Sequence, residues 1–356
     1  MADKHTKVTI PAIALGIAGS LLNGALADSP VNLKICDSSA VETARFLGKL
    51  TSNQSPWSSV TPKNFHFVLY PTDADSYTYG FTEGQLLSAG AKPVRCSEVN
   101  GLFKAPTALR IGEGNYNFAE PPAWDRTQSS SPFVSNDLLV LQAAAPVVLI
   151  KTNILLPPDA GLPPMSEAIA RFAVHEIFHR YQAHHFVFPK ETPDRTLEGC
   201  YKLSAWHSDI LSEFKEWDAL APMLETAPPQ QLLKGVASIL ARRTRPNLTP
   251  EEARCWEQVE AWERIEGMTH YFEIRASAQA LAKPIDDTWV FVGNTLSSGF
   301  FDTYSFSREF YYITGARIGR ILDRLDPADK WQDSVERGMS PAEVLRGFVS
   351  SGISHE

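Results

Sequence analysis

The sequence lacks the features that mark several classes of protein. It contains neither an internal repeat nor a low-complexity tract, and its 25 Pro and 21 Gly among 356 residues are ordinary numbers, which disfavours collagen-like, coiled-coil and disordered structures. After the first thirty residues, no stretch is apolar enough to span a bilayer. Lys and Arg total 33 against 41 Asp and Glu. This shortage of positive charge argues against nucleic acid or an anionic membrane surface as the main partner.

The first thirty residues have the layout of a secretory signal peptide. Two lysines precede the mostly apolar segment 8–27, which ends on the small residues Ala25 and Ala27, at the two positions that a signal peptidase reads. Proline, glycine and asparagine make this segment short and weakly hydrophobic for a membrane anchor, which is the alternative. We therefore expect residues 1–27 to be cleaved as a signal peptide. The mature chain would begin at Asp28 and be secreted or periplasmic, without membrane attachment.

Cysteine is scarce, and its spacing excludes a structural zinc site. None of the four cysteines forms a CxxC pair or has the close spacing of zinc ligands. In an exported chain, four thiols can form disulfides in three ways. Each half of the chain holds two cysteines, which favours Cys36–Cys96 with Cys200–Cys255 over the crossed pairings. Four free thiols would be the expectation for a cytosolic protein.

The residue pattern changes from strand-like to helical near residue 160. Before it, short apolar runs predict strands at 65–70, 107–111, 138–141 and 147–156, with a helix at 41–50. After it, apolar spacing predicts helices at 166–185, 201–222, 229–243, 250–281 and 307–325. Ser166 is a candidate cap, and Thr249 and Ser340 each begin a capping box with Pro at the first helical position. The expected fold class is α+β, with a β-rich N-terminal part (28–160) and a mainly helical part (161–356).

One short motif in the helical part carries chemistry. His175 and His179 lie four residues apart, so both imidazoles project from one helix face and can meet at one ion. Glu176 follows the first histidine and can act as general base toward an attacking water without being a ligand. The neighbouring residues are apolar, and burying these groups there without a metal would be costly. The motif therefore predicts one zinc ion, the alternative being a core helix that happens to carry two histidines.

A catalytic zinc ion needs a third protein ligand and an open position for water. His185 lies six residues after His179, where the metzincin pattern places a third histidine, but that pattern requires a sharp turn at a glycine, and the residue here is Gln182. Glu266, in the predicted helix 250–281, is the other candidate, because a glutamate from a separate helix completes the second main class of site. We expect Glu266 to be the ligand rather than His185. The competing interpretation of Glu266 is a solvated acid on an acid-rich helix.

Three segments resemble the gluzincin zinc metallopeptidases: His175-Glu176-x-x-His179, Glu266-Gly267 with Tyr271, and Tyr312-x-x-Gly315. The resemblance implies a zincin-like catalytic part in which His175, His179 and Glu266 bind Zn²⁺. It also implies that Glu176 is the catalytic base and that Tyr312 steadies the oxyanion, although a packing role for Tyr312 is the alternative.

The sequence thus predicts an exported zinc metallopeptidase that hydrolyses peptide bonds in a peptide or protein substrate. Neither nucleic acid nor a membrane is expected as a partner of the mature form. The alternative is an exported binding or interaction protein that retains a zinc-site scaffold without useful turnover.

Overall fold

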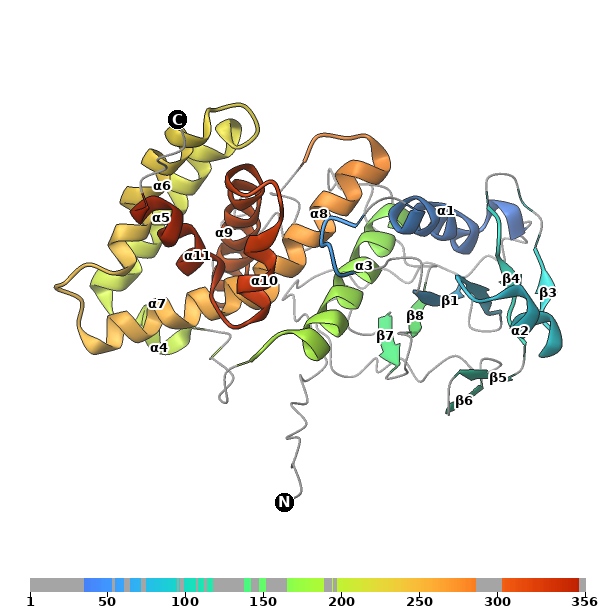
Figure 1. Ribbon diagram of the computed structural model, residues 1–356. Helices are drawn as coiled ribbons and strands as arrows, with labels where there is room; N and C mark the ends of the chain where they lie inside the picture. Colours follow the sequence, from blue (N-terminus) through green and yellow to red (C-terminus); the bar gives the residue numbers. More distant parts are fainter. Residues whose placement is uncertain are drawn as a thin grey trace, which may run out of the picture. The chain divides into compact units, whose positions relative to one another are not determined.

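The computed structural model describes residues 35–52, 55–60, 65–71, 75–94, 96, 99–106, 108–111, 114–117, 138–141, 147–151, 165–188, 194, 197–285 and 303–351 (Figure 1). The chain divides into two compact units, and each takes its residues from separate stretches of sequence. Unit 1 lies within Met1–Ser55, Val60–Ala183 and Gln279–Lys283. Unit 2 lies within Pro56–Ser59, His184–Ala278 and Pro284–Glu356.

Unit 1 contains the main sheet, whose strand order among the described residues is β3-β4-β2-β1-β8-β7. The strands are β1 (His66–Tyr70), β2 (Tyr77–Tyr79), β3 (Lys92–Pro93), β4 (Phe103–Lys104), β7 (Leu138–Leu141) and β8 (Val147–Lys151). β1 and β8 run parallel, with His66 opposite Val147, and the other neighbours are antiparallel. The central strand β1 is buried from Phe67 to Tyr70. A separate hairpin joins β5 (Ala108–Ile111) to β6 (Gly114–Asn117).

The helices of unit 1 are α1 (Ser39–Ser52), α2 (Glu83–Ser88) and most of α3 (Met165–His185), with a 3₁₀ turn η1 (Ile35–Asp37). A disulfide between Cys36 and Cys96 closes within this unit. The first turn of α3 is held by Glu167, which pairs with Arg171 (3.2 Å) and with Lys283 (2.9 Å). The latter pair joins α3 to the segment Gln279–Lys283, which also belongs to unit 1.

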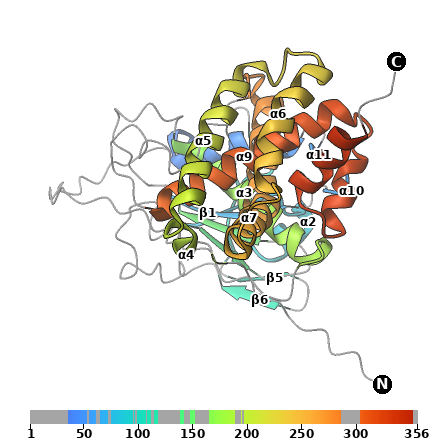
Figure 2. The ribbon, with the colours of Figure 1, turned by 90° about the vertical axis from the view of Figure 1, so that its left-hand side faces the viewer.

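Unit 2 is built from helices (Figures 1 and 2). They are α4 (Glu198–Tyr201), α5 (Ser204–Leu220), η3 (Ala221–Met223), α6 (Pro229–Arg243), α7 (Pro250–Trp262), η4 (Glu263–Gly267), α8 (Met268–Leu281), α9 (Thr303–Leu325), α10 (Lys330–Glu336) and α11 (Pro341–Ser350). The capping boxes at Thr249 and Ser340 are both formed, as predicted. A disulfide between Cys200 and Cys255 joins α4 to α7. Both disulfides have the pairing that the sequence predicted.

A short segment from the N-terminal half of the chain completes the core of unit 2. Trp57 is fully buried, and its Nε1 donates a hydrogen bond to Glu336 (2.7 Å). Its ring contacts the rings of Phe186, Tyr271 and Trp331. The side-chain amide of Gln332 accepts from the backbone N–H of Ser58 and donates to the carbonyl of Pro56. These contacts place Pro56–Ser59 in unit 2, although the flanking residues belong to unit 1.

Helices predominate beside a small sheet, in agreement with the expected α+β class, whereas the zincin-like character of the helical part stays a prediction. Two other expectations need correction. Ser166 is the second residue of α3 and not its cap, because the helix begins at Met165. The compact units also do not divide the chain at residue 160, because most of α3 belongs to unit 1 together with the sheet. Residues 166–175 of this helix are all buried, so α3 behaves as a core element of unit 1.

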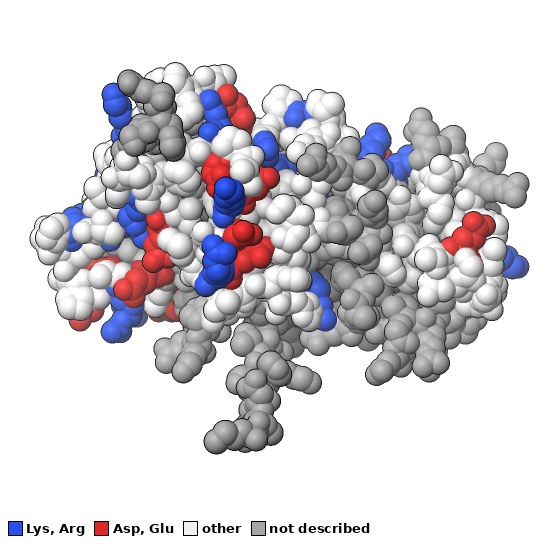
Figure 3. Space-filling model, viewed as in Figure 1, with Lys and Arg blue, Asp and Glu red and all other residues white. Residues whose placement is uncertain are grey.

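Within the part of the chain that the structure describes, no helix is both long and apolar enough to cross a bilayer. On the face shown in Figure 3, basic and acidic side chains lie close to one another over unit 2. Because the two signs alternate, this face does not carry an extended electrostatic field of one sign.

Candidate metal centre

Helix α3 brings three candidate metal-site residues together. His175, Glu176 and His179 each offer one ligand atom, and these atoms lie within 4.8 Å of one another. The two imidazole rings meet edge to face, with an interplanar angle of 81°. His175 and His179 are 3% and 7% exposed, whereas Glu176 is partly exposed. Two buried nitrogen donors beside a carboxylate form a group that can hold a metal ion.

The residues that surround this group in α3 are apolar and buried. Val174, Ile177 and Phe178 are buried beside them in the chain, and the ring of Phe172 stacks on His175 at 5.8 Å. The four-residue spacing places the histidines one turn apart on one face. Imidazoles in such surroundings need polar partners, because an unsatisfied buried polar group is costly.

One such partner is Gln182, which the sequence analysis considered only as the residue that replaces a glycine. Gln182 is 0% exposed, and its Oε1 lies 2.9 Å from Nδ1 of His179, one turn earlier. Second partners of this kind commonly orient metal-binding histidines. The sequence does contain a signal for this contact, because residues three apart on a helix are neighbours on its surface.

The helix continues through Gln182 without a turn and ends at His185. His185 is exposed at the last position. The sharp turn that the metzincin pattern requires is therefore absent from α3, as the sequence predicted from the lack of glycine.

Glu266 lies in unit 2, in the turn η4, which is a π-helical interruption of the long helix formed by α7 and α8. The sequence predicted one continuous helix here. Glu266 is 0% exposed, so its interpretation as a solvated acid is wrong. π-Helical turns inside α-helices occur frequently at functional sites. The role of Glu266 as third ligand stays a prediction, since the His175–Glu176–His179 group belongs to unit 1.

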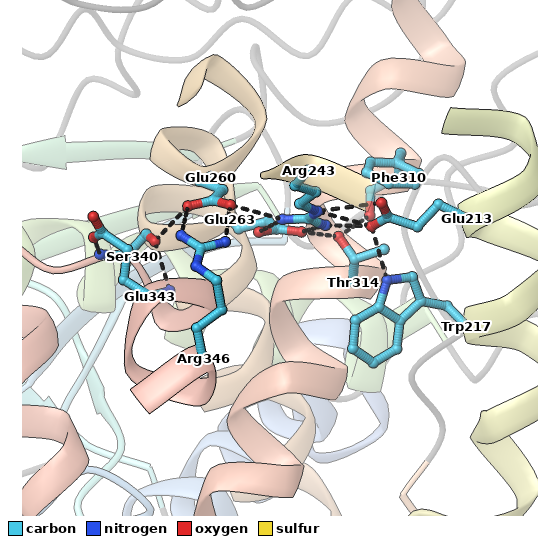
Figure 4. Close-up of polar contacts among 10 residues, drawn as sticks. All are labelled: Glu213, Trp217, Arg243, Glu260, Glu263, Phe310, Thr314, Ser340, Glu343 and Arg346. Atoms are coloured by element: carbon cyan, nitrogen blue, oxygen red, sulfur yellow. Dashed lines mark hydrogen bonds and ion pairs between the residues drawn. The ribbon is translucent and has the colours of Figure 1, made fainter. Parts of the chain in front are cut away.

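The turn η4 is anchored by a buried ion network centred on Arg243 (Figure 4). Glu263 accepts hydrogen bonds from Nη1 and Nη2 of Arg243 (2.8 and 2.7 Å) and from the hydroxyl of Thr314 (2.6 Å). On the other side, Glu213 accepts from Nε of Arg243 (3.0 Å) and from Nε1 of Trp217 (3.1 Å). Arg243, Glu213 and Glu263 have no exposed side-chain surface.

Burial and charge act in opposite directions on the pKa values of this network. Burial, together with the charge of Glu263, raises the pKa of Glu213 above its ordinary value, although Arg243 and Trp217 act to lower it. Burial lowers the pKa of Arg243, but Glu213 and Glu263 outweigh it and raise that pKa. Burial also raises the pKa of Glu260, and the hydrogen bonds and charges of Arg346 and Arg243 bring it below its ordinary value. Arg243 therefore stays positively charged, and its contacts with Glu213 and Glu263 are ion pairs.

The remaining residues of the gluzincin resemblance lie in the core of unit 2. Tyr312, on α9, is 5% exposed, and its ring packs 6.0 Å from His270 and 5.6 Å from Tyr311. Its packing role is evident, and a catalytic role stays a prediction. Tyr271 is buried and donates a hydrogen bond to Asp323 (2.7 Å).

Comparison with models of protein families, with curated proteins and with solved structures finds no match for this chain.

Proposed function

We propose that the protein is an exported zinc-dependent metallopeptidase. The observation that carries the proposal is the His175–Glu176–His179 group on a buried helix, with Gln182 against the second imidazole. Metal-dependent hydrolases use two histidines at this spacing as metal ligands, and they use a glutamate directly after the first histidine as the base. A zinc ion bound there would lower the pKa of a water molecule and polarise a peptide carbonyl.

The site residues divide the work between metal binding and catalysis in this proposal. His175, His179 and Glu266 hold the ion, and no fourth protein ligand is needed in a catalytic site. Glu176 takes the proton of the attacking water and passes it to the leaving amine. The partial exposure of Glu176, next to two buried histidines, suits a group that exchanges protons with a substrate. Tyr312 would steady the oxyanion.

The metal and the compartment are inferred from different residues. Imidazole and carboxylate ligands in a two-histidine site suit zinc. Two disulfides fit an extracellular location. We infer that the chain is exported by a signal peptide cleaved after Ala27, and N-terminal sequencing of the secreted protein should begin at Asp28. A mature protein that still carries residues 1–27 would contradict this.

The decisive experiment compares zinc content and cleavage of a peptide library in the mature protein. The wild type should bind about one zinc ion and cut peptides, and a chelator should abolish cutting. Glu176→Gln should keep the zinc ion but lose hydrolysis, because this side chain is not a ligand. The exposed Glu257→Gln variant is the matched control and should behave as wild type.

Two outcomes would contradict the proposal. Full activity in Glu176→Gln would rule out the mechanism. A wild type that binds zinc without any chelator-sensitive cleavage would instead favour an exported binding protein that retains the metal scaffold.

A further inference from the structure

With Oε1 of Gln182 facing Nδ1, the contact between Gln182 and a neutral His179 has one chemically consistent arrangement. A neutral imidazole has one N–H and one nitrogen with a free lone pair. Oε1 of Gln182, 2.9 Å from Nδ1 of His179, is an amide oxygen and can only accept. The proton of the imidazole therefore sits on Nδ1, and Nε2 keeps the lone pair that a metal ion requires.

The surroundings make this arrangement rigid. Both side chains are buried, and both belong to the same helix at positions three residues apart. Rotation of either side chain would break a buried hydrogen bond, which is costly. The opposite tautomer would place an N–H on Nε2, where the ion should bind, and would need the amide to turn its NH₂ group toward Nδ1.

We propose that Gln182 is a positioning residue of the metal site, which holds the His179 proton on Nδ1 and so presents Nε2 to the ion. The proposal rests on the proposed function, because it takes His179 as a ligand. It also explains the residue at this position. A glutamine lets α3 continue to His185 and accepts a hydrogen bond from the imidazole one turn earlier. A glycine would weaken the helix there.

The first test measures zinc affinity of the full mature chain by competition with a chromophoric chelator. Gln182→Met has nearly the same size but no acceptor oxygen, and it should bind zinc 10–100-fold more weakly, the usual cost of losing such a partner. Gln182→Glu keeps an acceptor and should restore affinity to at least the wild-type level. Gln332→Met is the matched control, because Gln332 is an equally buried amide that holds backbone groups in unit 2. It should leave zinc affinity unchanged.

The second test needs no metal ion. Long-range ¹H–¹⁵N NMR of the metal-free protein, with ¹⁵N-labelled histidine, reports which ring nitrogen carries the proton. The His179 signals, identified by their loss in His179→Ala, should show the Nδ1–H tautomer. In Gln182→Met they should shift toward the Nε2–H tautomer, which a merely structural role would not produce.

The outcomes separate this proposal from the proposed function. A wild type that binds no zinc would overturn the proposed function. A metal-free His179 protonated on Nε2 would overturn the role of Gln182, as would a Gln182→Met variant that keeps wild-type zinc affinity while His175→Ala loses the ion.

Discussion

Gly267 and Gly315 lie face to face where the π-helical turn η4 meets helix α9. A Cβ on Gly267 would lie 2.7 Å from Cα of Gly315, and a Cβ on Gly315 would lie 2.6 Å from Cα of Gly267. The atoms in the way are backbone atoms, which cannot rotate aside. Both glycines belong to the segments that resemble gluzincins, and here they let two helices approach closely beside Glu266.

Gly315→Ala should therefore destabilise the protein by about 3 kcal/mol or more, because the helices must separate to admit the methyl group. The free energy of unfolding in urea measures this. Gly347→Ala is the matched control, since Gly347 also lies within a helix but a Cβ there meets nothing within 4 Å. It should stabilise by about 0.5–1 kcal/mol. Equal effects at the two positions would contradict the close approach.

Arg243→Met should cost about 3–5 kcal/mol, because it leaves the carboxylates of Glu213 and Glu263 buried without a cation. Its neighbour on α6 provides the control. Arg242 pairs with Glu216 where the side chains are 18% and 37% exposed, so Arg242→Met should cost less than about 1 kcal/mol. Urea unfolding compares the two variants. Similar losses would mean that the buried network contributes no more than a surface ion pair.

Glu309 should make the protein less stable as the pH rises. Burial, with the nearby charge of Asp218, raises the pKa of Glu309 from 4.5 to about 7, and its Oε2 has no hydrogen-bond partner. A carboxyl whose pKa is higher in the folded state binds its proton more tightly there. Its contribution is therefore fully present below pH 4.5 and is lost as the pH rises through 7.

Glu309→Gln should remove this loss. Relative to wild type, the variant should gain about 3 kcal/mol in unfolding free energy between pH 4 and pH 8. Urea unfolding at the two pH values measures the gain, with Glu257→Gln as the exposed control. A difference between Glu309→Gln and wild type that is the same at both pH values would contradict the raised pKa.

Glu266→Ala should lower zinc affinity by orders of magnitude, because it removes the proposed third ligand. His185→Ala should leave zinc affinity nearly unchanged, because His185 is an exposed side chain at a helix end. Chelator competition on the two variants decides this. The reverse result would contradict the proposed gluzincin-like ligand set.

Much of the helical architecture could be predicted because its signals are local. The caps at Thr249 and Ser340 bond to residues three positions later, so the sequence alone contains both partners. The short strands β2, β3 and β4 were not predicted, since their pairing depends on residues distant in the chain. The grouping of α3 with the sheet was missed for the same reason.

The candidate site shows the same division. The His175–Glu176–His179 group follows from helical periodicity, and the structure confirms that these side chains converge. The contact of Gln182 also has helical spacing, but glutamine at a helix end is usually exposed, so burial was the missing information. The π-helical turn at Glu266 could not be predicted, because tertiary contacts such as Arg243 with Glu263 stabilise it.

The burial of Trp57 in unit 2 determines when, during synthesis of the chain, this unit can finish folding. Gln332, which binds the carbonyl of Pro56, is synthesised 276 residues later. Closing so long a loop costs entropy and makes folding slow. Trp57 is synthesised first, so during synthesis it stays without its final packing partners until Phe186 and Tyr271 have been added to the chain. A fragment that starts at residue 184 would lack the tryptophan altogether, so unit 2 cannot be obtained as a native piece by a single cut.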